Sequence, residues 1–271
     1  MRRILYAFLM LLVGMGTTAY ADFVQDFETD ASGWFDNDDS AGFGDISRVS
    51  SGTGGITSAG GSFHAIVEGE APSGVSAPFT RFGGYSSVWP AGGFTTSLDI
   101  YLDPSWAAGS GFDYSVAASG SDGNHQRDFI FHVASDTSSG DLIVAGSNNT
   151  NSATREDLDT LANNYEVTSA GWYTFEHVFR DQGGSLAVDM ILRDSLGNVL
   201  FTETRFNIAD TIPAEVGGNR YGWFTFNNVD GGVAVDNTSL TLAAVPEPAT
   251  MTVLGLGLAG MAAAQWRRKK S

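Results

Sequence analysis

The chain has 271 residues, a formal net charge of −17 and no cysteine. Its 31 acidic residues outnumber 14 lysines and arginines, which excludes a nucleic-acid-binding surface because affinity for phosphate depends on cationic side chains. The lack of cysteine also excludes a disulfide framework and a cysteine nucleophile.

The N-terminus has the three parts of a secretory signal peptide. Arg2 and Arg3 form a charged start, residues 4–16 are apolar, and Ala19-Tyr20-Ala21 supplies the small residues of a cleavage site. The sequence therefore predicts a signal peptide over residues 1–21 and export of the mature chain through the inner membrane.

Residues 22–244 are predicted to form one all-β domain, a two-sheet antiparallel jelly-roll sandwich. Glycine is abundant, with 34 residues, and polar turn residues separate short runs of alternating hydrophobicity. The predicted strands are Phe23–Glu28, Asp45–Val49, Phe63–Glu68, Thr95–Leu102, Phe112–Ala118, Phe129–Ala134, Asp141–Val144, Trp172–Phe179, Leu186–Arg193, Val199–Phe206, Tyr221–Phe226 and Val233–Leu242. No composition shift marks a second domain.

Two connections in this domain carry specific signals. Thr154–Tyr165 has a capping-type Thr and two leucines spaced for one short helix, which we expect to cross between the sheets. Asp194–Asn198 reads as a hairpin turn in which Gly197 takes a positive φ.

The charge of this domain limits its partners. Without the terminal signals it retains 8 arginines, no lysine and 30 acidic residues, a net charge of −22. Such a surface repels anionic lipid and favours divalent cations and neutral or cationic partners. Solubility alone is the alternative explanation for most of these acids.

The ends of the domain resemble the first and last strands of jelly-roll carbohydrate-binding modules. The resemblance rests on the segments Asp26–Asp38 and Val233–Leu242. It implies a structural calcium between the terminal strands, with Glu28 and Asp236 as ligands. Residues 36–40, Asp-Asn-Asp-Asp-Ser, also offer oxygen ligands, but Ala41 and Ser47 replace the Gly and the acid of an EF-hand, which favours a solvated turn.

The central segment Gly171–Asp194 instead resembles the hairpin of concanavalin A-like and laminin-G-like domains. Both resemblances imply a jelly roll, so they agree on the fold and differ on where a ligand binds.

Catalytic patterns are weak, and we expect no enzymatic activity. The four histidines are far apart in sequence and lack a zinc-binding spacing. No G-x-S-x-G elbow precedes a helix, and no clustered pair of strand carboxylates indicates a glycosidase.

Aromatic residues offer a way to bind sugar, because flat rings pack against sugar faces beside polar groups. Trp89 is the preferred candidate, since glycine pairs bracket its segment and predict a loop. Arg220 and Tyr221 are the second candidates.

The last segment, residues 245–271, has the features of a targeting signal rather than of a folded element. Pro246, Glu247 and Pro248 precede an apolar run, Met251–Ala264, and the chain ends in Arg-Arg-Lys-Lys-Ser. The prolines interrupt regular structure, and the basic end is expected to stay cytoplasmic while the apolar run forms a membrane-anchoring helix. A simple tail anchor is the alternative.

This order of triplet, apolar run and basic end resembles the PEP-CTERM sorting signal of exported bacterial proteins. The resemblance implies an exosortase as partner, with membrane anchoring before processing and a cell-surface or extracellular destination after it. We therefore expect a non-catalytic protein that binds carbohydrate or exopolysaccharide. The alternatives are a purely structural envelope or matrix protein and a divergent polysaccharide-degrading enzyme.

Overall fold

The computed structural model describes residues 21–39, 41–71, 76–84, 86–90, 92–148, 155–213, 215–217 and 222–243. All of them belong to one compact unit. The signal peptide up to residue 20, Arg220, Tyr221 and the triplet Pro246-Glu247-Pro248 with its apolar run lie outside these ranges. No helix within the ranges has the length and apolar character that a membrane crossing requires.

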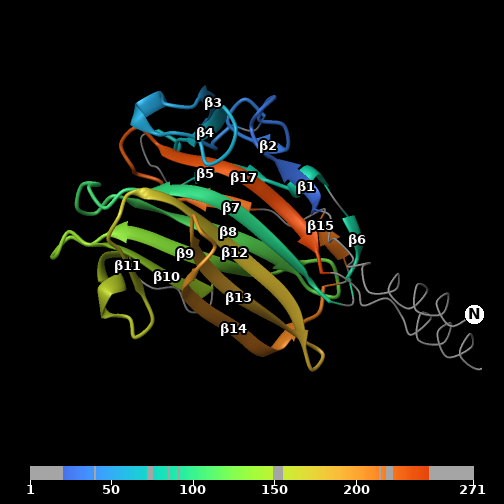
Figure 1. Cartoon of the computed structure of the whole chain (residues 1–271). Helices are drawn as coiled ribbons and strands as arrows, with labels where there is room; N and C mark the ends of the chain where they lie inside the picture. Colours follow the sequence, from blue (N-terminus) through green and yellow to red (C-terminus); the bar gives the residue numbers. More distant parts are fainter. Residues whose placement is uncertain are drawn as a thin grey trace, which may run out of the picture. The chain divides into compact units, whose positions relative to one another are not determined.

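Two antiparallel sheets face each other (Figure 1). The first contains β14 (Val199–Thr211), β13 (Ser185–Asp194), β12 (Gly171–Gln182), β7 (Phe94–Leu102), β17 (Val233–Leu242), β4 (Phe63–Val67) and β3 (Ile46–Ser50), with β1 (Ala21–Gln25) also on β17. The second contains β11 (Tyr165–Val167), β10 (Leu142–Asn148), β9 (His125–Ser135), β8 (Gly111–Ser119), β16 (Gly222–Thr225), β5 (Ser76–Thr80) and β2 (Trp34–Phe35). A small sheet pairs β6 (Ser86–Val88) with β15 (Glu215–Gly217), and the described residues also form the short 3₁₀ helices η1 (Thr53–Gly55), η2 (Phe82–Gly84) and η3 (Arg155–Thr160).

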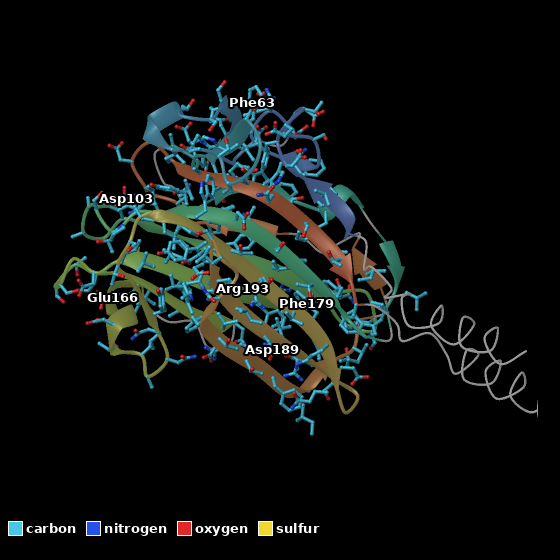
Figure 2. All side chains as sticks on the ribbon, in the orientation of Figure 1. Phe63, Asp103, Glu166, Phe179, Asp189 and Arg193 are labelled. Carbon is cyan, nitrogen blue, oxygen red and sulfur yellow. The ribbon has the colours of Figure 1, made fainter. Side chains whose placement is uncertain are left out.

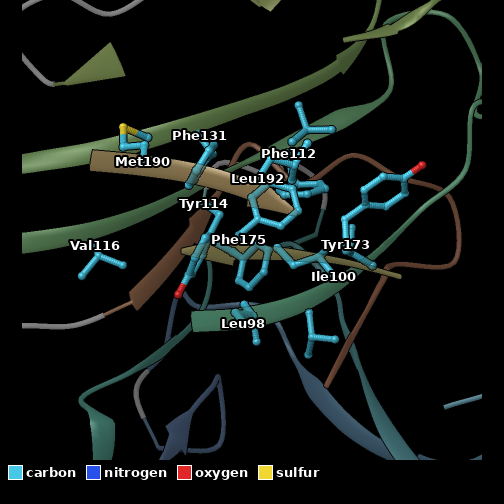
Figure 3. Packing of buried hydrophobic residues seen from close by; sticks show 14 of the residues in the cluster. Leu98, Ile100, Phe112, Tyr114, Val116, Phe131, Tyr173, Phe175, Met190 and Leu192 are labelled. Atoms are coloured by element: carbon cyan, nitrogen blue, oxygen red, sulfur yellow. The ribbon is translucent and has the colours of Figure 1, made fainter. Parts of the chain in front are cut away.

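The core lies between the two large sheets. Burial alternates along β7 and β12, so every second side chain points inward. Phe112 and Phe131 of one sheet meet Phe175 of the other, at ring-centroid distances of 6.3 and 5.0 Å from Phe175 (Figure 3). This interleaving of aromatic rings fixes the two sheets face to face.

β17 connects the ends of the chain to the middle of the first sheet. It pairs with β7 along one edge, and β4 and β1 share its other edge. The register shifts between Asp236 and Ser239, where Asn237 takes a φ of 48°. This bulge turns the strand from its β4 partner to its β1 partner.

The predicted two-sheet antiparallel jelly roll is confirmed, and every predicted strand overlaps an observed one. The hairpin between β13 and β14 is also confirmed. Gly197 has a φ of 83°, and the Asp194 carboxylate accepts hydrogen bonds from the N–H groups of Leu196 and Asn198, both at 2.9 Å.

The expected helix near Thr154–Tyr165 is wrong in type and placement. The described part is the 3₁₀ helix η3, which ends at Thr160, and Tyr165 already begins a strand. The segment joins β10 and β11, which pair with each other in one sheet, so it does not cross between sheets. Leu158 packs on Ile143 and Ala145, and this burial, rather than helical periodicity, explains the leucine spacing.

Candidate functional site

A polar cavity of about 770 Å³ opens beside the turn between β16 and β17. Carboxylate and amide side chains dominate its wall, with one aromatic ring among them. The lining residues are Asn37, Phe43, Gly44, Asp45, Glu68, Gly69, Glu70, Ala71, Asn227, Asn228, Val229, Asp230, Gly231 and Gly232.

A second cavity of about 440 Å³ lies on the other side of the same turn. Two aromatic residues, Tyr101 and Trp106, line it together with Asp103 and Asp230. The remaining wall comes from η1 and neighbouring residues: Thr53, Gly54, Gly55, Ile56, Ile66, Gly231, Gly232 and Ala234.

The shared turn, Asp230–Gly232, approaches β4 so closely that only glycine fits its last position. Gly232 has a φ of 81°, and an added Cβ would lie 2.7 Å from Ile66 Cγ2 and 2.8 Å from the Val67 carbonyl oxygen. Asp230 is exposed at the tip. The turn therefore stands between the two cavities as a common wall.

The two aromatic residues that line the smaller cavity each pack against another aromatic ring. Tyr101 meets Trp172 edge-on at 5.6 Å between ring centroids, and Trp106 meets the core residue Phe112 edge-on at 6.2 Å. Asp103 follows β7 (Figure 2), and its carboxylate accepts the Ser105 N–H at 2.8 Å. Tyr101, Asp103 and Trp106 are each half-buried. Rings and carboxylate are therefore positioned before any ligand arrives.

The predicted calcium ligands Glu28 and Asp236 both reach the connection between β3 and β4. Glu28 Oε1 accepts hydrogen bonds from the backbone N–H groups of Ser62 and Phe63, at 2.8 and 2.9 Å. The carboxylate thus fastens the end of this connection to the start of β4.

Asp236 fastens the same connection from β17. Its Oδ2 accepts the N–H groups of Ala59 and Gly60, at 3.0 and 3.2 Å, and its Oδ1 accepts the N–H of Asn237 at 2.9 Å. Burial of the side chain raises the Asp236 pKa to about 6, and the charge of Asp99, its cross-strand neighbour, adds to this.

These surroundings do not fit a calcium ion. Both oxygens of Asp236 already face N–H groups, whose partial positive charge repels a cation. Among the described residues, no three His, Asp or Glu side chains are close enough to hold a metal together. In the acidic turn, Asp36 Oδ1 accepts the Asp38 N–H at 2.9 Å, as in an ordinary Asx turn.

Trp89, the predicted sugar contact, packs against the core. It follows β6, is half-buried, and meets Phe94 edge-on at 5.5 Å. It lines neither cavity described above. Arg220 and Tyr221 lie outside the described residues.

The second sheet contains a Ser–His–Asp hydrogen-bond chain that we did not predict from the sequence. His132 Nδ1 lies 2.8 Å from Asp113 Oδ1, and His132 Nε2 lies 2.6 Å from Ser147 Oγ. Serine hydrolases use this order of groups. Asp113, His132 and Ser147 are 5%, 3% and 1% exposed, so the hydroxyl is shielded from a substrate. The assumption that β8, β9 and β10 pair in sequence order would have predicted that these three residues lie together.

Residues 244–269 match the PEP-CTERM protein-sorting motif, which confirms that assignment. No match was found among curated proteins.

Among solved structures, the chain is similar to the CBM2 module of the evolved Dit of Lactobacillus casei BL23 phage J-1, with 12% identity, 84% of this chain and 97% of that chain covered, and a TM-score of 0.42. Peanut lectin with a bound peptide matches with 9% identity, 74% and 92% coverage and a TM-score of 0.38. The Ca²⁺/Man3GlcNAc-bound form of the VIP36 exoplasmic/lumenal domain matches with 10% identity, 75% and 84% coverage and a TM-score of 0.38.

Proposed function

We propose that this protein is a non-catalytic component of the bacterial cell surface or extracellular matrix whose β-sandwich binds polysaccharide. The PEP-CTERM motif implies export, anchoring of the C-terminal segment in the membrane and processing by an exosortase. After processing, the protein reaches the cell surface or the extracellular matrix and binds its ligand there.

The smaller cavity is the observation that supports a polysaccharide ligand. Tyr101 and Trp106 line it beside the carboxylates of Asp103 and Asp230. Aromatic rings pack on the C–H faces of sugars, and carboxylates accept hydrogen bonds from sugar hydroxyls. The larger cavity continues the polar surface past the turn, which suits a chain longer than one sugar.

A role without catalysis is supported by the burial of the hydrolase-like Asp113–His132–Ser147 arrangement. Ser147 is 1% exposed, and its hydroxyl is already hydrogen-bonded to His132. A serine esterase that removes acyl groups from polysaccharide is nevertheless the second candidate, because the Asp113–His132–Ser147 chain has the hydrogen bonds of an acyl-transfer site. Such a site would not cleave the glycosidic bonds themselves, which requires a pair of carboxylates. A fluorophosphonate probe distinguishes the two: it should leave Ser147 unlabelled, and stoichiometric labelling that Ser147→Ala abolishes would favour the hydrolase.

A glycan array probed with the purified full chain, with and without EDTA, tests the proposal. We expect binding to polysaccharides, no release of new reducing ends, and the same signals in EDTA. Binding to no glycan would instead favour a purely structural envelope or matrix protein. Signals lost in EDTA would support the calcium bridge through Glu28 and Asp236, which the hydrogen bonds around these residues do not favour. Trp89, Arg220 and Tyr221 stay predicted contacts, to be tested as alanine variants on the same array.

A further inference from the structure

Acidic side chains line both cavities in the part of the chain that the structure describes. Asp45, Glu68 and Glu70 line the larger one, Asp103 the smaller, and Asp230 both. No arginine, lysine or histidine is among the described residues that line either cavity. A ligand that brings positive charge would therefore gain favourable interactions here.

The arginines with described side chains are engaged elsewhere. Four of them form ion pairs, and two lie over phenylalanine rings. The pairs are Arg127–Asp210, Arg180–Asp189, Arg193–Glu176 and Arg205–Glu203, while Arg48 lies over Phe63 and Arg81 over Phe35 and Phe79. Asp103 and Asp230 thus face a ligand without competition from these side chains.

Two of the three described amide side chains that line the larger cavity already donate a hydrogen bond within the protein. Asn227 Nδ2 donates to the Val67 carbonyl at 2.8 Å, and Asn228 Nδ2 donates to the Gly109 carbonyl at 3.1 Å. Carboxylates only accept, so the acidic side chains make the wall rich in acceptors. A sugar hydroxyl both donates and accepts, whereas an ammonium group carries three donors and no acceptor. The hydrogen-bonding character of the wall matches the ammonium better.

A single metal ion does not explain this charge. Within the described ranges, no three acidic or histidine side chains lie close enough to share one ion. Carboxylates spread along two cavities match charges spread along a polymer. In the smaller cavity, Tyr101 and Trp106 also line the wall, and aromatic rings attract cations and pack against sugar rings.

We infer that the polysaccharide bound by these cavities is a polymer of amino sugars with free, protonated amino groups. The inference rests on the proposed function and specifies its ligand class. Asp103 and Asp230 pair with ammonium groups, and Tyr101 and Trp106 support the sugar ring between them.

Calorimetric titration of the full chain with two probes tests this: the glucosamine hexasaccharide and its N-acetylated counterpart, in mildly acidic buffer. We expect the free amine to bind about tenfold more tightly. Asp103→Asn with Asp230→Asn should weaken binding of the amine probe about fivefold. Asparagine keeps an oxygen for the Ser105 N–H, so the fold should be retained.

The matched control is Asp159→Asn with Glu166→Gln, which removes the same charge at exposed positions outside both cavities. It should bind the amine probe like the parent. Equal affinity for the two probes overturns the inference and leaves the proposed function intact. An equal loss in the control overturns the assignment of the site, since general surface charge would then explain binding. Binding to neither probe, together with a blank glycan array, removes the proposed function as well.

Discussion

Asp236 acts as a backbone anchor, and its removal should be costly with or without calcium. Asp236→Ala leaves the N–H groups of Ala59 and Gly60 without their acceptor, which should lower the free energy of unfolding by about 2 kcal/mol. Urea unfolding in calcium and in EDTA measures it. Asp38→Ala, at an exposed turn, is the control and should change little. A calcium-dependent gain in the parent that Asp236→Ala abolishes would contradict the anchor role.

His177 should make the protein sensitive to acid. The ring is fully buried and donates to the Phe129 carbonyl at 3.0 Å, and burial lowers the His177 pKa from 6.5 to about 3. Between these values the unfolded chain binds more protons, so this contribution to stability is lost as the pH falls, by up to about 1.4 kcal/mol per pH unit.

Replacing His177 with Phe should remove that slope. Asp236 acts in the opposite sense, because its pKa is raised and the folded state holds the extra proton. The informative quantity is therefore the difference between the variant and the parent in urea unfolding across mildly acidic pH. A difference that stays constant with pH would show that His177 does not titrate as its burial implies.

Single residues were only partly predictable. The terminal strands predicted that Glu28 and Asp236 lie near each other, but Glu28 Oε1 and Asp236 Oδ2 accept hydrogen bonds from backbone N–H groups of a connection distant in sequence. No sequence motif marked Tyr101 and Trp106 as cavity residues, because the cavity that they line also needs a turn more than a hundred residues away in sequence. Trp89 looked like a free loop ring, yet a non-local contact with Phe94 partly buries it.

The connection between β3 and β4 forms one wall of the smaller cavity. Trp172 holds it by donating its indole N–H to the Thr57 carbonyl at 2.7 Å. Trp172→Phe removes this donor and keeps a ring, so the connection should open more often and amide exchange in η1 should rise several-fold. Hydrogen–deuterium exchange measures this.

Trp89→Phe is the control, since Trp89 lies against Phe94 and not against this connection. Its exchange in η1 should equal that of the parent. If Trp172→Phe also leaves η1 unchanged, the indole hydrogen bond does not hold the wall.

Elements with strong alternation were predictable, and short ones were not. The long strands β7 and β12 bury every second residue over most of their length, and this period shows in the sequence. β2 and β11 have two and three residues, too few for any period to emerge. The segment around η3 has the leucine spacing of an α-helix because Leu158 and Leu161 contact the same sheet surface.

At the scale of the whole molecule, sorting should depend on the triplet. Replacing Pro246 and Glu247 with alanine should leave the protein uncut and retained in the inner membrane, because the apolar run is unchanged while the processing enzyme loses its recognition motif. Immunoblots of fractionated cells report the outcome. Normal processing of the double variant would exclude the triplet as the sorting determinant.

The fold class followed from composition and turn spacing, whereas the binding surface depends on how distant segments meet. The turn Asp230–Gly232 becomes a common wall of both cavities only because β17 lies between β4 and β7. No local pattern in the sequence encodes that neighbourhood. Net charge alone indicated the class of partner, neutral or cationic, and the acidic cavity walls now give that expectation a location.

The central claim is that polysaccharide binds along the cavities on either side of this turn. Hydrogen–deuterium exchange of the full chain, saturated with the oligosaccharide that binds best on the array, tests it most directly. Protection should concentrate in residues 53–56, 101–106 and 227–232, because these segments line the cavities. Saturated binding with protection confined to other segments, such as residues 86–89 around Trp89, would contradict it.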